Sequence, residues 1–230
     1  MTHELLVGTR GWDVDAWQGG FYPDELPAEW RFSFYSNLYR SVLVPGEAWE
    51  TVTPDEVAEW LEDSDPEFRF VCELPPASSH PNEDAPALER FLDLSAPLAP
   101  RTAARLIRIT DPTEPAPRWL AGRLAVVGDE FPLCVDLPPG AWRGEPLRAV
   151  VQAAGASLCW RPELEAEPSA HGEFLVALAA NAPLTALRTM VATVGRWMDG
   201  TRGAGCFFEP VEQAPKLAQE TRILAELLEI

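Results

Sequence analysis

Short apolar runs recur along the chain, and each is followed by a stretch whose apolar residues have helical spacing. The runs are rich in Val, Leu, Ile, Phe and Cys, which is typical of strands that are buried on both faces. There are eight of them, at residues 5–7, 41–44, 68–73, 105–109, 133–136, 157–160, 174–178 and 206–208.

The stretches between the runs carry helix signals. Pro54 begins one of them, with Asp55 and Glu56 in its first turn, because proline pre-sets the helical φ and acids favour the positive end of the helix dipole. Further stretches that place apolar side chains along one helical face are residues 85–94, 145–154, 184–198 and 216–228.

Strands that alternate with helices predict a parallel sheet. Eight strands in a chain of 230 residues fit an α/β fold of the (β/α)8 TIM-like barrel class, and we expect one domain over residues 1–230. The competing fold is an open doubly wound sheet. It would be favoured by a glycine-rich phosphate loop, and the sequence contains no G-x-G-x-x-G.

The charge balance narrows the class of partner. Thirty-six acidic and 18 basic residues give a formal charge of −18, which repels a nucleic-acid backbone, and no Lys/Arg cluster stands out in the sequence. Lys216 is the sole lysine, which disfavours Schiff-base chemistry. The sequence shows no apolar run of about 18 residues and no visible signal peptide. We therefore expect no membrane association and a cytoplasmic location.

The cysteines and most tryptophans fit a packed core. Cys72, Cys134, Cys159 and Cys206 lie in predicted strands without zinc spacing, so we expect buried, free thiols. We likewise assign to helix–barrel packing a set of tryptophans with apolar neighbours, namely Trp30, Trp49, Trp60, Trp119, Trp160 and Trp197.

Several motifs occur in a recognisable order. They are Gly-Thr-Arg-Gly-Trp at 8–12, Trp-x-Gly-Gly-Phe-Tyr-Pro at 17–23, Phe-Tyr at 34–35, Glu56 to Trp60, Phe-Arg-Phe-Val at 68–71, His80, Leu-Cys-Val-Asp at 133–136 before Trp142, and Cys-Phe-Phe at 206–208. This order resembles the YecE-like proteins, a family known by a domain of unknown function with the number 72. The resemblance implies a TIM barrel related to sugar isomerases, with no established reaction.

The chain departs from that family at the strand ends. Members usually carry Glu and Asn on the second strand, Lys at the end of the third, Arg and His after the acid of the fifth, and Asn-Asn on the last. The matching residues here are Leu43 and Pro45, Glu73, Leu137 and Pro138, and Glu209 and Pro210, while Asp136 keeps the acid. Any activity that the family shares is therefore expected to be lost or changed.

In a barrel, ligands bind where the carboxyl ends of the strands meet. Arg10 with Trp12 and Trp17 would suit an anionic or sugar-like ligand, because a guanidinium binds carboxylate or phosphate in a two-point fork. The alternative is that the tryptophans cap the barrel and Arg10 pairs with Glu73 or Asp136. The full set of candidate ligand-binding residues is Arg10, Trp12, Trp17, Tyr22, Asp111, Trp142 and Glu209.

Acidic residues also follow the predicted strands. Glu73 and Asp136, with His80 in the loop after the third strand, are the candidate catalytic groups for general acid/base chemistry. The same acids could hold a divalent metal or form salt bridges, and we assign no metal ligand and no cofactor.

Two functions stay open. One is a non-catalytic barrel that binds a small ligand or a protein partner. The other is a sugar or sugar-phosphate isomerase or hydrolase that uses strand-end carboxylates, with or without a divalent metal. The first is motivated by the missing family residues, and the second by the barrel and the acids with Arg10.

Overall fold

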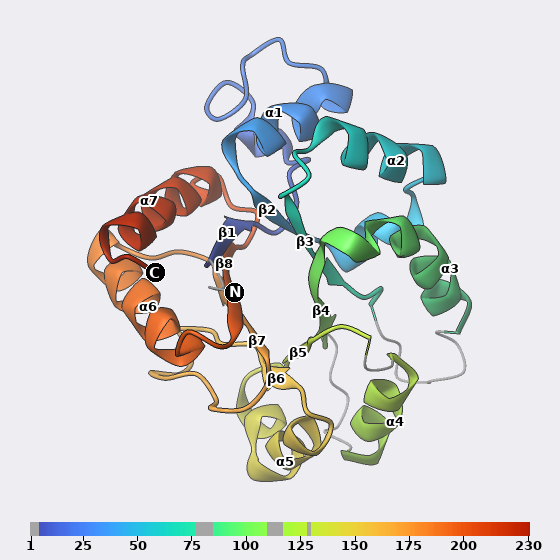
Figure 1. The fold of residues 1–230 in the computed structure, drawn as a ribbon, viewed down its shortest axis with the longest axis vertical. Helices are drawn as coiled ribbons and strands as arrows, with labels where there is room; N and C mark the ends of the chain where they lie inside the picture. The colour runs from blue at the N-terminus through green and yellow to red at the C-terminus, as the bar shows by residue number, and fades with distance from the viewer. Residues whose placement is uncertain (1–4, 77–84, 110–116, 128–129) are drawn as a thin grey trace.

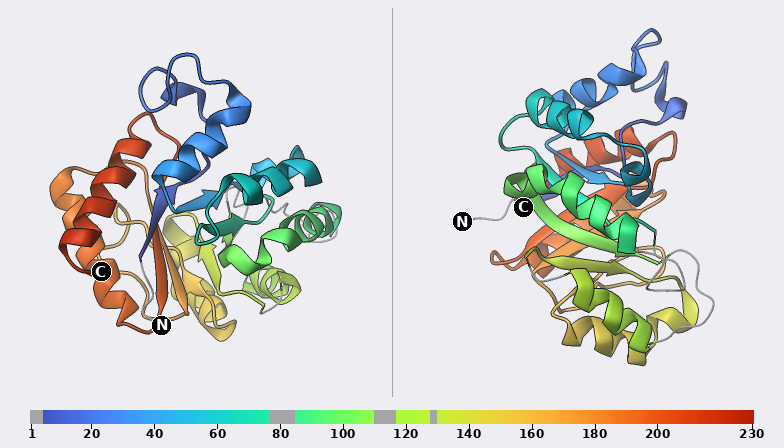
Figure 2. Two further views of the ribbon diagram at one scale, coloured as in Figure 1. Left: turned by 45° about the horizontal axis from the view of Figure 1, so that its top comes forward. Right: turned by 90° about the vertical axis from the view of Figure 1, so that its right-hand side faces the viewer.

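The computed structural model describes residues 5–76, 85–109, 117–127 and 130–230. In this part of the chain eight parallel strands stand at the centre and helices surround them (Figures 1 and 2). The strands are β1 (Leu6–Thr9), β2 (Ser41–Val44), β3 (Arg69–Glu73), β4 (Thr102–Arg108), β5 (Leu133–Asp136), β6 (Ser157–Leu158), β7 (Phe174–Ala179) and β8 (Gly203–Phe208). The predicted strands and the TIM-like barrel are confirmed.

The strands form two ladders that meet at two seams. One ladder has the order β1-β8-β7 and the other the order β2-β3-β4-β5-β6. At the first seam Arg10 forms a parallel bridge with Leu43, and Gly11 N donates to Leu43 O at 2.8 Å. At the second, Trp160 bridges Ala177. Each seam has a single backbone bridge and one serine side chain across it: Ser41 Oγ donates to Val7 O at 3.0 Å at the first seam, and Ser157 Oγ donates to Phe174 O at the second. The seams therefore carry fewer backbone hydrogen bonds than the ladders.

Helices follow the strands around the outside (Figure 1). The α-helices are α1 (Arg31–Leu38), α2 (Pro54–Asp63), α3 (Ala85–Ser95), α4 (Pro117–Val127), α5 (Glu145–Ala153), α6 (Leu184–Met198) and α7 (Ala214–Leu227). Short 3-10 turns are η1 (Asp15–Trp17), η2 (Ala28–Trp30), η3 (Gly46–Glu50), η4 (Ala96–Arg101) and η5 (Gly140–Arg143).

The regular alternation is broken after β6. Residues 161–173 form turns and bends where the pattern predicts a helix. Pro162, Pro168 and Gly172 in this segment disfavour a helix interior. The consequence is a long connection from the mouth of the barrel, and this connection carries Arg161 and Glu165.

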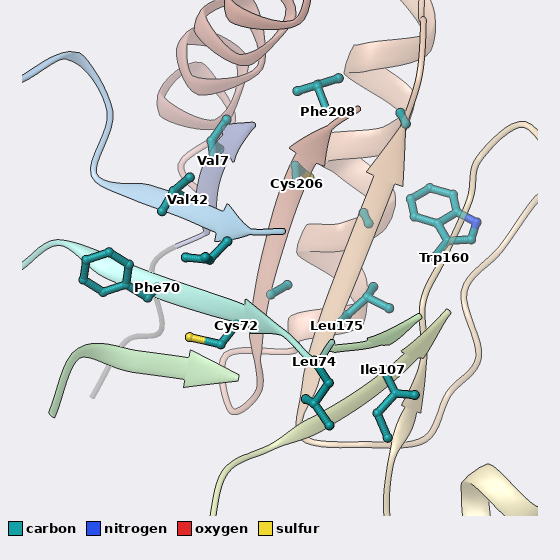
Figure 3. Packing of buried hydrophobic residues seen from close by; sticks show 14 of the residues in the cluster. Val7, Val42, Phe70, Cys72, Leu74, Ile107, Trp160, Leu175, Cys206 and Phe208 are labelled. Atoms are coloured by element: carbon teal, nitrogen blue, oxygen red, sulfur yellow. The ribbon is translucent and has the colours of Figure 1, made fainter. Parts of the chain in front are cut away.

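The core has two layers because successive side chains on a strand point to opposite faces. Inside the barrel lie apolar residues that include Leu43, Val71, Leu106, Cys134 and Phe207. The alternate positions pack in a second cluster with the helices, and Figure 3 shows part of it, including Val42, Phe70, Cys72, Leu74, Ile107, Leu175 and Phe208.

Three expectations from the sequence can be compared with this packing. All four cysteines are buried and free, as predicted. The assignment of Trp30 to helix–barrel packing is wrong, because 62% of its surface is exposed at the end of η2. No helix in the described ranges has the length and apolar character to cross a membrane.

Candidate functional site

The carboxyl end of the barrel carries a layer of charged side chains. On β3, β4 and β5, Glu73, Arg108 and Asp136 each stand two positions beyond a residue of the barrel interior, which the period of a strand brings to the same face. We call the full set the charge layer: Arg10, Glu73, Arg108, Asp136, Arg161 and Glu209. In barrel order its signs alternate, and three cations face three anions.

Arg10 and Glu73 form a buried ion pair in one half of the layer. Arg10 Nε donates to Glu73 Oε2 at 2.7 Å and Arg10 Nη2 to Glu73 Oε1 at 2.9 Å. The other edge of the guanidinium binds Glu47 on η3, with Nη1 to Oε1 at 2.9 Å and Nη2 to Oε2 at 2.5 Å. Arg10 therefore pairs with Glu73 and not with Asp136, which decides between the two partners that the sequence left open.

Burial and pairing act against each other at this pair. Burial raises the pKa of Glu73, and the Arg10 hydrogen bonds oppose that rise. Burial also tends to lower the pKa of Arg10, but the hydrogen bonds and charges of Glu73 and Glu47 together outweigh it and raise that pKa. For Glu47, partial burial tends to raise the pKa, and the hydrogen bonds it accepts together with the charges of Arg10 and Arg108 bring the pKa below its usual value. Arg10 thus stays charged, and Glu73 is the member of the pair whose charge is more easily lost.

Asp136 lies at the centre of the second half. Arg161 binds it through two nitrogens, with Nε to Oδ1 at 3.0 Å and Nη2 to Oδ2 at 2.6 Å. Arg143 Nη2 donates to Oδ1 at 3.3 Å, and Arg108 Nε lies 3.6 Å from Oδ2. Asp136 is 4% exposed, so three guanidinium groups surround a buried carboxylate.

Glu209 connects β8 with the arginines of the opposite ladder. Its Oε1 accepts from Arg108 Nη2 at 2.7 Å and from Arg161 Nη2 at 3.0 Å. Interactions with Asp136 and Glu209 raise the pKa of Arg161 although burial tends to lower it. These hydrogen bonds span the barrel mouth and hold the charges fixed.

A cavity of about 340 Å³ lies beside this second half. We call it the mouth cavity. It is lined by Arg108, Ile109, Asp136, Leu137, Pro138, Pro139, Arg161, Glu163 and Leu164. Arg10 and Glu73 are not part of the lining. Among the predicted site residues that the structure describes, Asp136 alone is in the lining of this cavity, and two arginines join it there.

The aromatic candidates lie in packing contacts. Trp12 meets Phe32 and Trp60 edge-on, at ring centroid distances of 4.7 and 4.8 Å. Trp17 is 1% exposed and donates from Nε1 to Val211 O at 2.9 Å, and the Tyr22 hydroxyl donates to Trp12 O.

Three further candidates complete the set. Trp142 is 6% exposed on η5, with its ring 6.2 Å from that of Trp119. His80 and Asp111 lie outside the described residues. Ligand binding by the aromatic candidates, and the roles assigned to His80 and Asp111, stay predictions.

Three arginines near the mouth were not predicted from the sequence. Arg108, Arg143 and Arg161 are separated by 35 and 18 residues along the chain, so no cluster shows in the sequence. Two of them carry a local signal, since Arg108 and Arg161 stand two positions beyond buried residues of the barrel interior, Leu106 and Cys159. Within the described ranges, no three His, Cys, Asp or Glu side chains come together in a group that could hold a metal ion.

A family model described as "Protein of unknown function DUF72" matches residues 6–227. A DUF72 protein structure from Thermotoga maritima MSB8 superposes with a TM-score of 0.77 and 17% identity, covering 99% of this chain and 100% of that one. One from Enterococcus faecalis V583 gives 0.74 and 12%, with 99% and 98% covered.

A structure outside the family is also similar. D-psicose 3-epimerase with D-tagatose, from Clostridium cellulolyticum H10, gives a TM-score of 0.60 and 8% identity, with 98% of each chain covered. No curated protein matches the chain. At these identities the structural matches show a common fold and not a common reaction.

Proposed function

Since the chain belongs to the DUF72 family of proteins of unknown function, we propose that it is a non-catalytic member that binds a small organic anion in the mouth cavity. One observation carries the proposal. Arg108 and Arg161 both line the cavity, and both donate to the same oxygen of Glu209. Two guanidinium groups that converge on one carboxylate oxygen are what recognition of an anionic ligand requires.

Glu209 serves as an internal counter-ion in this proposal. Its side chain is 14% exposed and is not part of the cavity lining. An incoming carboxylate or phosphate exchanges with it, so the arginines keep a negative partner while Glu209 turns toward solvent. The apolar part of the lining, from Ile109, Leu137 and two prolines, favours a ligand with an organic body over a bare inorganic ion.

The pairing of the carboxylates argues against acid/base catalysis in the cavity. A general acid or base needs a pKa near the working pH and access to the substrate. Asp136 and Glu209 each accept hydrogen bonds from two arginines, so their oxygens are already engaged and are not free to take a proton from a substrate. Glu73 has a raised pKa but is held by Arg10 away from the cavity lining.

A second candidate is a sugar isomerase or epimerase that uses Glu73 as its base. The raised pKa of Glu73 favours it, together with the similarity in fold to an epimerase whose structure contains D-tagatose. This mechanism requires Arg10 to release Glu73 when a substrate arrives.

Calorimetry with a panel of small carboxylates, sugar phosphates and uncharged ketoses tests the first proposal. We expect anions to bind and uncharged sugars not to bind. Arg161→Gln should weaken binding at least about tenfold, because a hydrogen bond to a charged group contributes roughly 1.5–3 kcal/mol. Glu209→Gln should tighten binding, since it removes the competing charge.

The matched control is Arg196→Gln on α6, where an exposed arginine pairs with Glu167 at 3.4 Å. It changes the net charge equally and should leave binding unchanged. Equal binding by wild type and Arg161→Gln would refute the proposal. Conversion of a ketose to an isomer, abolished by Glu73→Gln, would instead support the second candidate.

A further inference from the structure

A second and larger hollow lies at the opposite end of the barrel. Its volume is about 1140 Å³, and residues at the amino ends of the strands line it, among them Leu6 on β1, Arg69 on β3, Thr102 on β4 and Gly203 on β8. We call it the amino-end hollow. Side chains of α7, including Arg222, complete its wall.

Two of the arginines that line this hollow, Arg69 and Arg202, lack the ion pairs found at the mouth among the described residues. Arg69 Nη1 donates to two backbone carbonyls, Pro66 O at 3.1 Å and Phe68 O at 3.2 Å. Arg202 Nη1 donates to Ala170 O at 2.8 Å. Among the described residues, no carboxylate forms an ion pair with Arg69 or Arg202. In a chain with 36 acidic and 18 basic residues, two cations without an anionic partner in one hollow are unexpected.

The other charges of the lining are weakly engaged. Arg40 and Glu67 are 3.4 Å apart, with about three-quarters of each side chain exposed, and Arg222 lies 3.8 Å from Glu226. Exposed pairs of this kind contribute little and exchange readily with solvent ions. Glu173 is the remaining acid of the lining.

The positions of Arg69 and Arg202 specify the shape of a ligand. Arg69 begins β3 and Arg202 immediately precedes β8. In barrel order β8, β1, β2 and β3 are consecutive, so the two backbone positions lie three strand spacings apart, about 14 Å along the wall. Both side chains line the hollow, and two cations on different sides of it favour an anion with two or more charged groups over a single charge.

The same positions lie on either side of the first seam between the ladders. β1 and β2 share one backbone bridge, at Arg10 and Leu43 near the mouth. A ligand held by Arg69 and Arg202 would connect the two ladders at the other end of that seam. Binding would therefore stabilise the folded barrel in proportion to ligand concentration.

We propose that the amino-end hollow is a binding site for a small multivalent anion, held through its phosphate or carboxylate groups by Arg69 and Arg202. The site is structural or regulatory, because barrel chemistry takes place at the carboxyl end of the strands. It does not depend on the function proposed for the mouth cavity.

Titration calorimetry and thermal unfolding of the full chain test the proposal, with pyrophosphate, citrate and acetate at matched ionic strength. We expect pyrophosphate or citrate to bind with 1:1 stoichiometry and to raise Tm, and acetate to do neither. If pyrophosphate alone binds, the ligand is a phosphate, and if citrate alone binds, it is a carboxylate. If both bind, the site selects for charge and not for the kind of anionic group.

Variants locate the binding. Arg69→Gln and Arg202→Gln should each weaken it at least about tenfold, and the matched surface control Arg196→Gln should not. Trp197 gives an optical signal, since the Arg202 guanidinium lies 4.0 Å from its ring centroid. An anion that draws Arg202 away should change tryptophan emission, and Trp197→Phe should abolish that change while calorimetry still detects binding.

Three results would overturn the proposal: no binding by either multivalent anion, equal binding by wild type and Arg69→Gln, or loss of binding in Arg161→Gln, which would place the anion at the mouth. The mouth proposal is tested by Arg161→Gln with organic anions, so the two proposals fail independently.

Discussion

Replacing Arg10 by methionine would leave the buried Glu73 carboxylate without its principal cation. Arg10 donates both short hydrogen bonds to Glu73, whose surface is 3% exposed. Breaking a buried ion pair from one side costs about 3–5 kcal/mol, because an uncompensated charge stays behind. The bonds to Glu47 add little, since 58% of that side chain is exposed. We therefore expect Arg10→Met to lower the free energy of unfolding by about 3–5 kcal/mol at pH 7.

The loss should depend on pH in a defined direction. Burial already raises the pKa of Glu73 in the folded protein above its ordinary 4.5, and the loss of Arg10 removes a group that opposes this rise. The folded state of the variant then retains a proton that the unfolded state has released. The variant is therefore most stable below the pKa that Glu73 has in the unfolded chain. Its stability falls by up to about 1.4 kcal/mol per pH unit as the pH rises toward the higher pKa that Glu73 has in the folded protein. The variant should recover much of its stability at pH 5.

Urea unfolding followed by circular dichroism at pH 5 and pH 7 measures both effects. Glu73→Gln in the Arg10→Met background should restore most of the stability at pH 7, because the buried charge is gone. Glu47→Gln, which removes the exposed partner of the same arginine, serves as the control and should cost less than about 1 kcal/mol. A loss below about 1 kcal/mol in Arg10→Met, or a loss that is the same at both pH values, would refute the ion-pair reasoning.

Three smaller predictions concern the fold. Gly8→Ala should destabilise strongly, because its Cβ would lie 2.2 Å from Ser41 O, and a lowered Tm would show it. Thr53→Ala removes the capping box of α2 and should lower the free energy of unfolding, measured in urea, by about 1 kcal/mol. Hydrogen bonds from Thr53 lower the pKa of Glu56, so the stabilisation by the capping box should fade as the pH falls below the usual glutamate range. The four buried cysteines should resist a thiol reagent in the native protein and react in denaturant, and fast native reaction would contradict their burial.

Much of the barrel follows from local patterns. All eight apolar runs coincide with strands, because strands buried on both faces need uninterrupted apolar residues. The helices α2, α3, α5, α6 and α7 were predicted from their sequence signals, chiefly one apolar face each, whereas α1 and α4 were not predicted. The segment 161–173 was less predictable, since its prolines disfavour a helix but do not specify the connection that replaces it.

The candidate site was predicted only in part. Strand ends identified Arg10, Glu73, Asp136 and Glu209 as mouth residues, and the structure places all of them in the charge layer. Their partners could not be predicted, because an ion pair depends on which side chains meet across the barrel. Arg161 and Glu209 are 48 residues apart in sequence, yet their side chains are joined by a hydrogen bond of 3.0 Å.

The sequence by itself determined the barrel, its family and the end at which charges gather, because strand period and burial are properties of neighbouring residues. Only the tertiary structure decided that these charges alternate in sign and bind one another, and that the mouth cavity is lined by Arg108 and Arg161. It also decided that Arg69 and Arg202 at the other end form no ion pair with any carboxylate in the part of the chain that the structure describes. The physical reason is that electrostatic pairing is set by distances in space, which follow from the order and register of strands from distant parts of the chain.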